Sequence, residues 1–373
     1  MDKLHRDPPT SYPKIIDKRL QQIRFAIEDL KLDGFALTYL PNIRYLTNFS
    51  GSSAFLFILP NEIHFVTDDR YEYQLKGELF PIKNMKIHIT REVWKLVSED
   101  RILGPKVKTI GFEADKMYYS EAVEIRNMVR PLKFKPTPGE IEPFTMPKDD
   151  EELQSIKDAC KMCEDVYDYI KGVIKPGMTE WDITNQIAYK ARQLGSEGVP
   201  FHIICTSGSN TAMAHLHPTM RKIKKGDLLL LEFGCTVNGF ASTLSRTLAV
   251  RKATPEQEKI YRMLIEAQNA TFKNLRQGIV GKVLETYARK VINEGGYGQY
   301  FKTNLGHGVG ITYNEKPYIN SRSEDIVPEG CVMAIEPGIY IPNKFGMRIK
   351  DTAKVFKDSV MQITFPPDKL EVI

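Results

Sequence analysis

The segment 228–247, LLLLEFGCTVNGFASTLSRT, constrains the fold most, because it reads as two apolar strands on either side of an Asn-Gly dipeptide at 238–239. Asn-Gly is the dipeptide that two-residue hairpin turns favour. A hairpin closed there pairs Gly234 with Thr243. Side chains alternate between the faces of a strand, so Glu232 and Thr243 share one face as diagonal neighbours. The sequence therefore predicts an antiparallel hairpin that carries a carboxylate within an apolar strand.

A second hairpin is predicted where AIEPGIYI (334–341) is followed by GMRIKDT (346–352). Glu336 and Lys350 have the same parity across this turn, so their side chains can share a face, whereas Asp351 points to the opposite face. The lysine interrupts an otherwise apolar strand, as the glutamate of the first hairpin does. This pattern predicts charged side chains that are held together at a site rather than solvated at the surface.

Length and charge limit the classes of protein that the chain can belong to. Its 373 residues, 42% hydrophobic and 27% charged, are typical of a soluble globular protein with two domains. The net charge of +5 is small, and Lys and Arg are scattered among Asp and Glu, so no nucleic-acid partner is expected. The best apolar run, 54–59, has the length of a strand and predicts no membrane span.

The termini and cysteines predict a cytoplasmic protein. Residues 1–14 contain no apolar stretch of the kind that signal peptides require. The five cysteines form an odd set without the spacing of a disulfide framework. Cys160 and Cys163 lie within a helical pattern, with no second pair elsewhere, so core packing is favoured over a zinc or redox site.

The first domain, predicted at 1–135, alternates helix and strand in an α/β pattern. Apolar residues recur at helical spacing over 14–32. Short apolar strands are predicted at 35–40, 54–59 and 63–68, and Pro60-Asn61 offers a hairpin turn between the last two.

A linker is predicted at 136–150, where four prolines oppose regular structure. Asp149 or Asp150 is a good N-cap for the helix that follows, and Thr179 opens a second helix with a sequence like a capping box. The second domain is predicted at 151–373. Its order of helices, strands, helices and strands favours an α+β layout, with helices against a curved antiparallel sheet.

Segments in both domains resemble the methionine aminopeptidase, prolidase, aminopeptidase P and creatinase family. This resemblance implies a creatinase-type N-terminal domain and a C-terminal "pita-bread" domain, in which helices cover a curved antiparallel sheet. The segments that carry it are 41–58, 67–74, 196–219, 228–247, 304–310 (NLGHGVG), 334–341 and 346–352.

Metal-dependent members of this family bind two divalent ions through two Asp, one His and two Glu. The five matching positions in this chain are Glu232, Thr243, His307, Glu336 and Lys350. Thr243 removes one negative charge, and Lys350 replaces another with a positive charge. A buried ammonium between two carboxylates can form an ion-paired cluster that needs no metal ion to neutralise it. We therefore expect no cofactor, with one divalent ion at Glu232, His307 and Glu336 as the alternative.

The resemblance also implies roles for individual side chains. Catalysis is assigned to His215 as general acid and base, with Glu232 or Glu336 positioning water or substrate. Asn314 stands where the family has a second active-site histidine, and His202 and His217 are expected to be buried structural residues. The residues expected to bind a small amide or a peptide carboxylate are His307, Lys350, Arg348 and Tyr340.

The expected function is that of an Xaa-Pro dipeptidase or aminopeptidase P relative that has lost its dinuclear metal site. Such a protein would hydrolyse a C–N bond without metal, or bind a small amide-like or peptide-like compound. One alternative is an active Xaa-Pro metallopeptidase that uses one metal ion. Another is a non-enzymatic peptide-binding module, because folds of this kind are reused for recognition. The resemblance further implies a homodimer.

Overall fold

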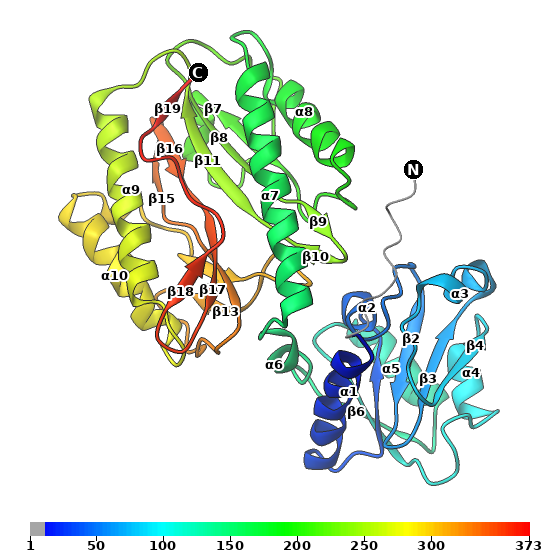
Figure 1. The fold of residues 1–373 in the computed structure, drawn as a ribbon. Helices are drawn as coiled ribbons and strands as arrows, with labels where there is room; N and C mark the ends of the chain where they lie inside the picture. The colour runs from blue at the N-terminus through cyan, green and yellow to red at the C-terminus, as the bar shows by residue number, and fades with distance from the viewer. Residues whose placement is uncertain (1–11) are drawn as a thin grey trace. The chain divides into compact units, whose positions relative to one another are not determined.

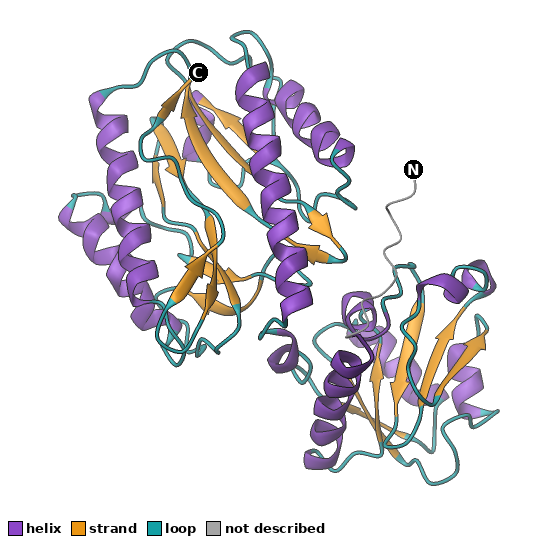
Figure 2. Ribbon diagram, in the orientation of Figure 1, coloured by secondary structure: helices purple, strands orange, loops and turns teal. Residues whose placement is uncertain are grey.

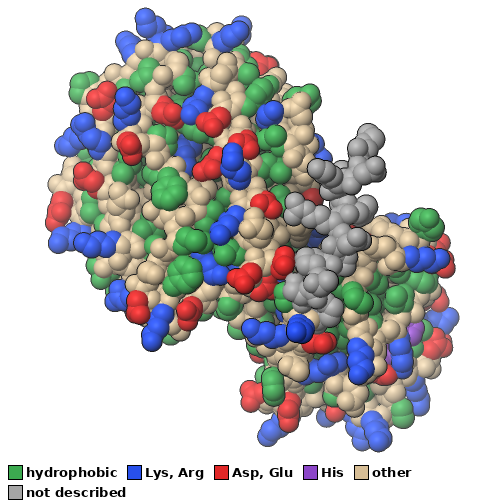
Figure 3. All heavy atoms as spheres, in the orientation of Figure 1, with side chains coloured by type: hydrophobic (Ala, Val, Ile, Leu, Met, Phe, Trp, Pro, Cys, Tyr) green, Lys and Arg blue, Asp and Glu red, His purple; other side chains and the backbone are tan. Residues whose placement is uncertain are grey.

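The computed structural model of the chain describes residues 12–373 and divides into two compact units, Met1–Phe144 and Thr145–Ile373. Residues 1–11, on which most of the signal-peptide argument rests, lie outside the described residues. No helix between residues 12 and 373 is long and apolar enough to cross a membrane. On the face drawn in Figure 3, Lys and Arg are interspersed with Asp and Glu in each unit.

The first unit is built on one mixed sheet of six strands in the order β4-β3-β2-β1-β5-β6. Strands β2, β3 and β4 of this sheet are labelled in Figure 1. β1 pairs antiparallel with β2 and parallel with β5. The strands are β1 (Gly34–Leu37), β2 (Ala54–Ile58), β3 (Ile63–Thr67), β4 (Met85–Ile89), β5 (Thr109–Phe112) and β6 (Lys133–Pro136). The helices are α1 (Tyr12–Asp29), α2 (Leu40–Thr47), α3 (Leu75–Glu78), α4 (Val93–Ser98) and α5 (Tyr119–Met128), with a 3₁₀ turn, η1 (Asp69–Tyr71).

The helix predicted at 14–32 is confirmed as α1, whose apolar stripe is buried. Complete burial of each such aliphatic side chain stabilises the fold by about 1.5–3 kcal/mol. The strand predicted at 35–40 is shorter than expected. It ends at Leu37, because Pro41 lies in the first turn of α2, where a proline needs no backbone N–H.

The segment predicted as a linker, 136–150, contains more regular structure than its prolines suggested. Pro136 closes strand β6, and a one-turn helix, α6 (Glu142–Thr145), contains Pro143 near its start. A proline is tolerated there, since the first N–H groups of a helix have no intrahelical partner. The division between the two units falls after Phe144.

The second unit packs long helices against mainly antiparallel sheets (Figure 2), which confirms the α+β pita-bread fold. Its helices are α7 (Asp150–Val173), α8 (Glu180–Gln193), α9 (Pro255–Asn274) and α10 (Gly281–Glu294), with 3₁₀ turns η2 (Gly208–Ala212) and η3 (Gly298–Tyr300). Its strands are β7 (Ile204–Ser207), β8 (Leu228–Phe233), β9 (Thr236–Val237), β10 (Phe240–Ala241), β11 (Leu244–Ala249), β12 (Gly306–Gly308), β13 (Glu315–Ile319), β14 (Val332–Ile335), β15 (Gly338–Ile341), β16 (Phe345–Arg348), β17 (Asp351–Val355), β18 (Val360–Gln362) and β19 (Glu371–Val372).

Two large hydrophobic clusters join the helices of this unit to its sheets. Side chains of α7 and α8 pack on β8 and β11, and side chains of α9 and α10 pack on β14 and β17. Cys160 and Cys163 are buried in α7 within apolar clusters, which confirms their packing role. The capping boxes at Asp149 and Thr179 fix where α7 and α8 begin.

The registers of both predicted hairpins are confirmed. Val237 pairs with Phe240 across the Asn-Gly turn between β9 and β10, and Glu232 pairs with Ser245 in the same register between β8 and β11. In the second hairpin Gly338 pairs with Arg348, which places Glu336 and Lys350 opposite each other beyond the paired strands.

Candidate active site

The second unit contains a cavity of about 230 Å³ in which most of the predicted site residues meet. Carboxylates, imidazoles, one ammonium and several apolar side chains share its wall. The lining residues are Phe201, His202, Ile203, Ile204, His215, His217, Glu232, His307, Tyr313, Asn314, Glu336 and Lys350. Ligand sites commonly combine an apolar wall with a few convergent polar groups in this way.

An ion-paired cluster forms the charged part of the wall. Lys350 Nζ lies 2.5 Å from Glu232 Oε1 and 2.7 Å from Glu336 Oε2. Burial lowers the pKa of Lys350, but the two carboxylates outweigh burial and raise the pKa above its usual value. The ammonium between two carboxylates, expected from the charges at the positions that match the family, is therefore present.

Arg348 binds the same cluster from outside the cavity. Its guanidinium is buried and donates to Glu232 Oε2, and its Nε donates to Ser245 Oγ at 3.3 Å. Burial alone would raise the pKa of Glu232, but Arg348 and Lys350 lower it to about 2. Arg348 was expected to bind a ligand, but it is not among the residues that line the cavity. Its guanidinium binds Glu232 instead.

His307 is held by its backbone. A Cβ added at Gly306 would lie 2.4 Å from the carbonyl oxygen of Ala334, and one at Gly308 would lie 2.3 Å from that of Lys316. Only glycine allows the neighbouring strands to approach this closely, as the sequence predicted. Thus the position of the imidazole is fixed by strand packing on both sides.

The tautomer of His307 follows from its hydrogen bond. Nδ1 lies 2.9 Å from the carbonyl oxygen of Gly308, which can only accept, so Nδ1 carries the proton. Burial, and then the charge of Lys350, lower the pKa of His307 and favour the neutral ring. Nε2 therefore presents a lone pair, 3.7 Å from Glu336 Oε1.

Three more histidines line the cavity. His215 comes from the irregular segment that follows η2, as does His217, and His202 precedes β7. The rings of His202 and His217 lie with their centroids 5.1 Å apart. All three side chains are exposed, so the expectation that His202 and His217 are buried structural residues is wrong. These two histidines join the candidate site.

Other predicted positions lie behind the cavity wall. Tyr340 is buried against Ile204 and Leu230, and burial raises its pKa to about 12. Thr243 is buried and is not a lining residue. Asp351 points away from the cavity, as predicted, and forms a buried ion pair with Arg246 at 2.6 Å.

Sequence reasoning did not single out the aromatic residues of the site. Phe201 and Tyr313 both line the cavity, and their ring centroids lie 4.6 Å apart. Each lies beside a residue that the sequence had marked, His202 and Asn314 respectively. The contact between the two rings joins segments that are far apart in the sequence, so it could not be predicted. The position of each aromatic residue beside a marked residue was the one sequence feature that pointed to it.

The fold and the site together define the pita-bread class of peptidases and related hydrolases. The chain matches the family described as Metallopeptidase family M24 over residues 154–355, and the Creatinase/Prolidase N-terminal domain over residues 19–144. Because the first match covers more than half of its length, the chain belongs to metallopeptidase family M24.

Individual relatives resemble the chain over nearly its whole length. An Xaa-Pro dipeptidase of Pyrococcus horikoshii is 27% identical, with 94% of this chain and 97% of that protein covered. The solved structure of an Xaa-Pro dipeptidase from Bacillus anthracis has a TM-score of 0.90 at 29% identity, covering 96% of this chain and 100% of that one. The structure of an X-Pro aminopeptidase from Thermotoga maritima has a TM-score of 0.88 at 28% identity, with 95% and 99% covered.

The family corrects the expectation that the chain uses no cofactor. The matched family is one of metallopeptidases, whose prolidases are dinuclear metalloenzymes, so a divalent metal is the cofactor that membership implies. The residues present do not fit a two-ion set, since Thr243 and Lys350 supply no carboxylate at their positions. Glu232, His307 and Glu336 retain donor types that hold one ion, but Lys350 Nζ is bound to both carboxylates.

Proposed function

We propose that the chain is a peptidase that hydrolyses the bond before proline in short Xaa-Pro peptides, with the cavity as its reaction centre. The observation that carries the proposal is the grouping of four imidazoles and two carboxylates around one cavity of about 230 Å³. This volume is below the ~300 Å³ at which sites for drug-sized ligands begin, so it suits a dipeptide-sized substrate. The Xaa-Pro peptidases among its relatives support the choice of bond.

Two carboxylates line the cavity, and Glu336 is better placed than Glu232 to act on water. Both oxygens of Glu232 are bound, Oε1 by Lys350 and Oε2 by Arg348. Glu336 uses Oε2 for Lys350, while its Oε1 lies 3.7 Å from His307 Nε2. Glu336 Oε1 is therefore the oxygen that can orient an attacking water and take its proton.

His215 is the group proposed to handle the proton of the leaving amine. Its imidazole lines the cavity and is exposed, so the ring can exchange protons with solvent. Water oxygen bonds to the carbonyl carbon, the C–N bond breaks, and the proline nitrogen leaves with a proton from His215. Histidine is the side chain that most often serves as general acid or base in enzymes.

Family membership supports a requirement for a divalent ion. Glu232, His307 and Glu336 would hold it, and the ion would have to displace the Lys350 ammonium from both carboxylates. When bound, such an ion supplies activation of water and polarisation of the carbonyl. His307 is suited to this role, because the Gly308 carbonyl fixes its tautomer and leaves Nε2 as the ligand atom.

The test is release of free proline from Gly-Pro and Leu-Pro by the purified full-length chain. The protein is treated with chelator, and activity is measured with and without millimolar Mn²⁺ or Co²⁺. We expect release that the added metal stimulates. His215→Ala is expected to lower kcat by about 100-fold, the lower range for loss of a general acid.

His88→Ala is the matched control, because His88 lies on β4 in the first unit, whereas the cavity belongs to the second. It should leave proline release unchanged. Leu-Gly serves as the substrate control and should be cleaved poorly. If Gly-Pro and Leu-Pro stay intact with and without metal, the proposed function is wrong, and binding of uncleaved peptides would then indicate a peptide-binding module.

A further inference from the structure

His215 and His217 lie on a segment whose path is not set by regular secondary structure. The segment leaves β7 at Ser207, makes the single 3₁₀ turn η2, and continues without helix or strand to Thr219. Backbone hydrogen bonds within it join near neighbours, as between Met213 N and the carbonyl oxygen of Asn210 at 3.0 Å. The two imidazoles therefore depend on other contacts for their positions.

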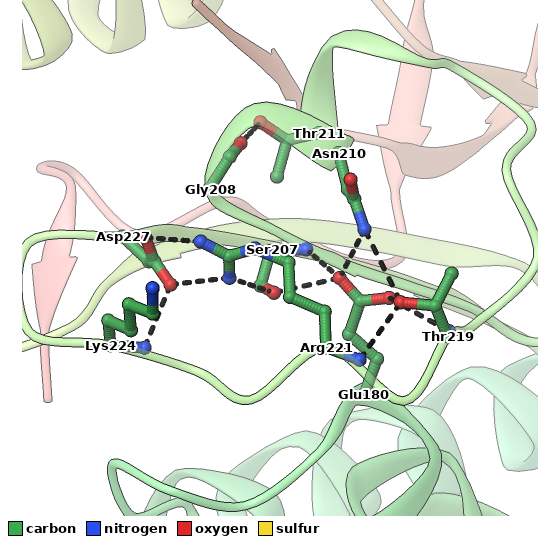
Figure 4. Close-up of polar contacts among 9 residues, drawn as sticks. All are labelled: Glu180, Ser207, Gly208, Asn210, Thr211, Thr219, Arg221, Lys224 and Asp227. Carbon is green, nitrogen blue, oxygen red and sulfur yellow. Dashed lines mark hydrogen bonds and ion pairs between the residues drawn. The ribbon is translucent and has the colours of Figure 1, made fainter.

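Those contacts converge on the carboxylate of Glu180, in the first turn of α8 (Figure 4). Oε1 accepts from Ser207 N at 2.7 Å, from Ser207 Oγ at 2.7 Å and from Asn210 Nδ2 at 3.1 Å. Oε2 accepts from Thr219 N at 2.8 Å and from Thr219 Oγ1 at 2.7 Å. One oxygen thus binds the start of segment 207–219, and the other binds its end.

The carboxylate is completely buried, with 0% of Glu180 exposed. A buried carboxylate is costly unless each oxygen accepts hydrogen bonds, and Glu180 accepts five. Hydrogen bonds to an ionised acceptor are about twice as strong as neutral ones. These five bonds therefore constrain both ends of the segment far more than its own backbone contacts do.

Further hydrogen bonds hold the same segment in place. Arg221 donates to Ser207 Oγ at 2.6 Å and to Asp227 Oδ2 at 2.6 Å (Figure 4). On the far side of the segment, Gly346 N donates to Thr211 Oγ1 at 2.8 Å, which ties η2 to β16. The segment is thus held at its two ends by Glu180 and near its middle by the second hairpin.

We propose that Glu180 is a positioning residue, which sets the path of segment 207–219 and so places His215 and His217 at the cavity. The assignment of a catalytic effect to this placement rests on the proposed function, whereas the placement itself does not. Glu180→Gln is the informative change. The amide can still accept through its oxygen, but its NH₂ group would face Thr219 N or Ser207 N, each of which is also a donor.

The experiment compares Glu180→Gln with wild type in the full-length protein by two measurements. The first is two-dimensional NMR of the histidine rings in protein labelled with ¹³C at histidine, with His215 and His217 assigned by substitution. We expect the resonances of these two rings to shift or broaden, while that of His64, in the first unit, stays in place. The second is proline release, in which kcat should fall by about 100-fold with a small change in KM, as for a misplaced catalytic group.

Glu285→Gln is the matched control. Glu285 is also a buried glutamate of a helix, but it lies on α10 and accepts from Arg289 Nε at 2.7 Å. Its substitution should leave the rings of His215 and His217 and the value of kcat unchanged. If Glu180→Gln does not fold, Thr219→Val removes one donor from Oε2 and should shift the same two resonances by less.

Unchanged His215 and His217 resonances in a folded Glu180→Gln protein, or in Thr219→Val if only that variant folds, would overturn the proposal. The NMR result also separates it from the proposed function. If the wild-type chain releases no proline, the proposed function fails, and the ring resonances still decide whether Glu180 positions the histidines.

Discussion

Substitution of Lys350 by methionine tests whether the ion-paired cluster stabilises the second unit. Methionine keeps an unbranched side chain, one atom shorter than that of lysine, and removes the ammonium that lies 2.5 Å and 2.7 Å from Glu232 and Glu336. Only 4% of the Lys350 side chain is exposed, so water does not replace the lost charge. Removal of one partner from a buried ion pair costs about 3–5 kcal/mol, or roughly a hundredfold or more in the folding equilibrium.

The assay is urea unfolding followed by tryptophan fluorescence. A Trp94→Phe background leaves Trp181, on α8, as the reporter of the second unit. We expect the loss in free energy of unfolding caused by Lys350→Met to be largest near neutral pH. It should shrink as pH falls, because protonation of a carboxyl removes the unpaired charge. Glu336→Gln added to Lys350→Met should recover part of the loss.

Lys344→Met is the matched control, since Lys344 is exposed in the turn of the same hairpin. It should unfold at the same urea concentration as the parent. A Lys350→Met protein that matches the parent at pH 7, or whose deficit does not change with pH, would refute the argument that a buried ammonium neutralises the two carboxylates.

Three further predictions concern buried charges and a buried hydroxyl of the second unit. Since the pKa of Glu232 is lowered to about 2 from 4.5, its stabilising effect is complete above pH 4.5 and is lost as pH falls toward 2; denaturation at a series of pH values should show a loss on the order of 3 kcal/mol from this group. Asp351→Asn leaves Arg246 buried without its anion and should lower the free energy of unfolding by about 3–5 kcal/mol, measured by urea unfolding. Within residues 12–373 the buried Thr243 hydroxyl has no hydrogen-bond partner, so Thr243→Val should change the thermal midpoint little or raise it.

Local rules predicted the geometry within each hairpin, whereas the family resemblance was what brought Glu232 together with Glu336 and Lys350. The Asn-Gly turn fixed one register, and strand parity placed Lys350 with Glu336 and turned Asp351 away. Both inferences need only the alternation of side chains along a strand. The fold class followed from the order of helices and strands together with the resemblance of whole segments, whereas the ends of short elements such as β1 depended on individual prolines.

Of the four histidines that line the cavity, His202 and His217 were not predicted as site residues. His202 and His217 lie in segments without regular structure, where no periodicity indicates direction. The placement of His217 depends on contacts between residues far apart in the sequence, such as those of Glu180 with Thr219. For the same reason the sequence could not show that Arg348 binds Glu232 rather than a ligand.

Charge counting also did not decide the cofactor. It predicted the contacts of Lys350 correctly. Those contacts do not decide whether a metal ion can displace the ammonium from the two carboxylates. Family membership gave the opposite expectation to the one drawn from charge. The homodimer remains a prediction, which light scattering of the purified chain can test.

The glycines on either side of His307 make that position a convenient place for redesign. Strand β12 is held by backbone carbonyls that lie where a Cβ of Gly306 or Gly308 would stand, so its path does not depend on which side chain residue 307 carries. Glutamine or asparagine at 307 should therefore enter the cavity from the same backbone point as the imidazole does. A library of substitutions at residue 307, with both glycines unchanged, would vary the chemistry of the cavity while the backbone of β12 is preserved.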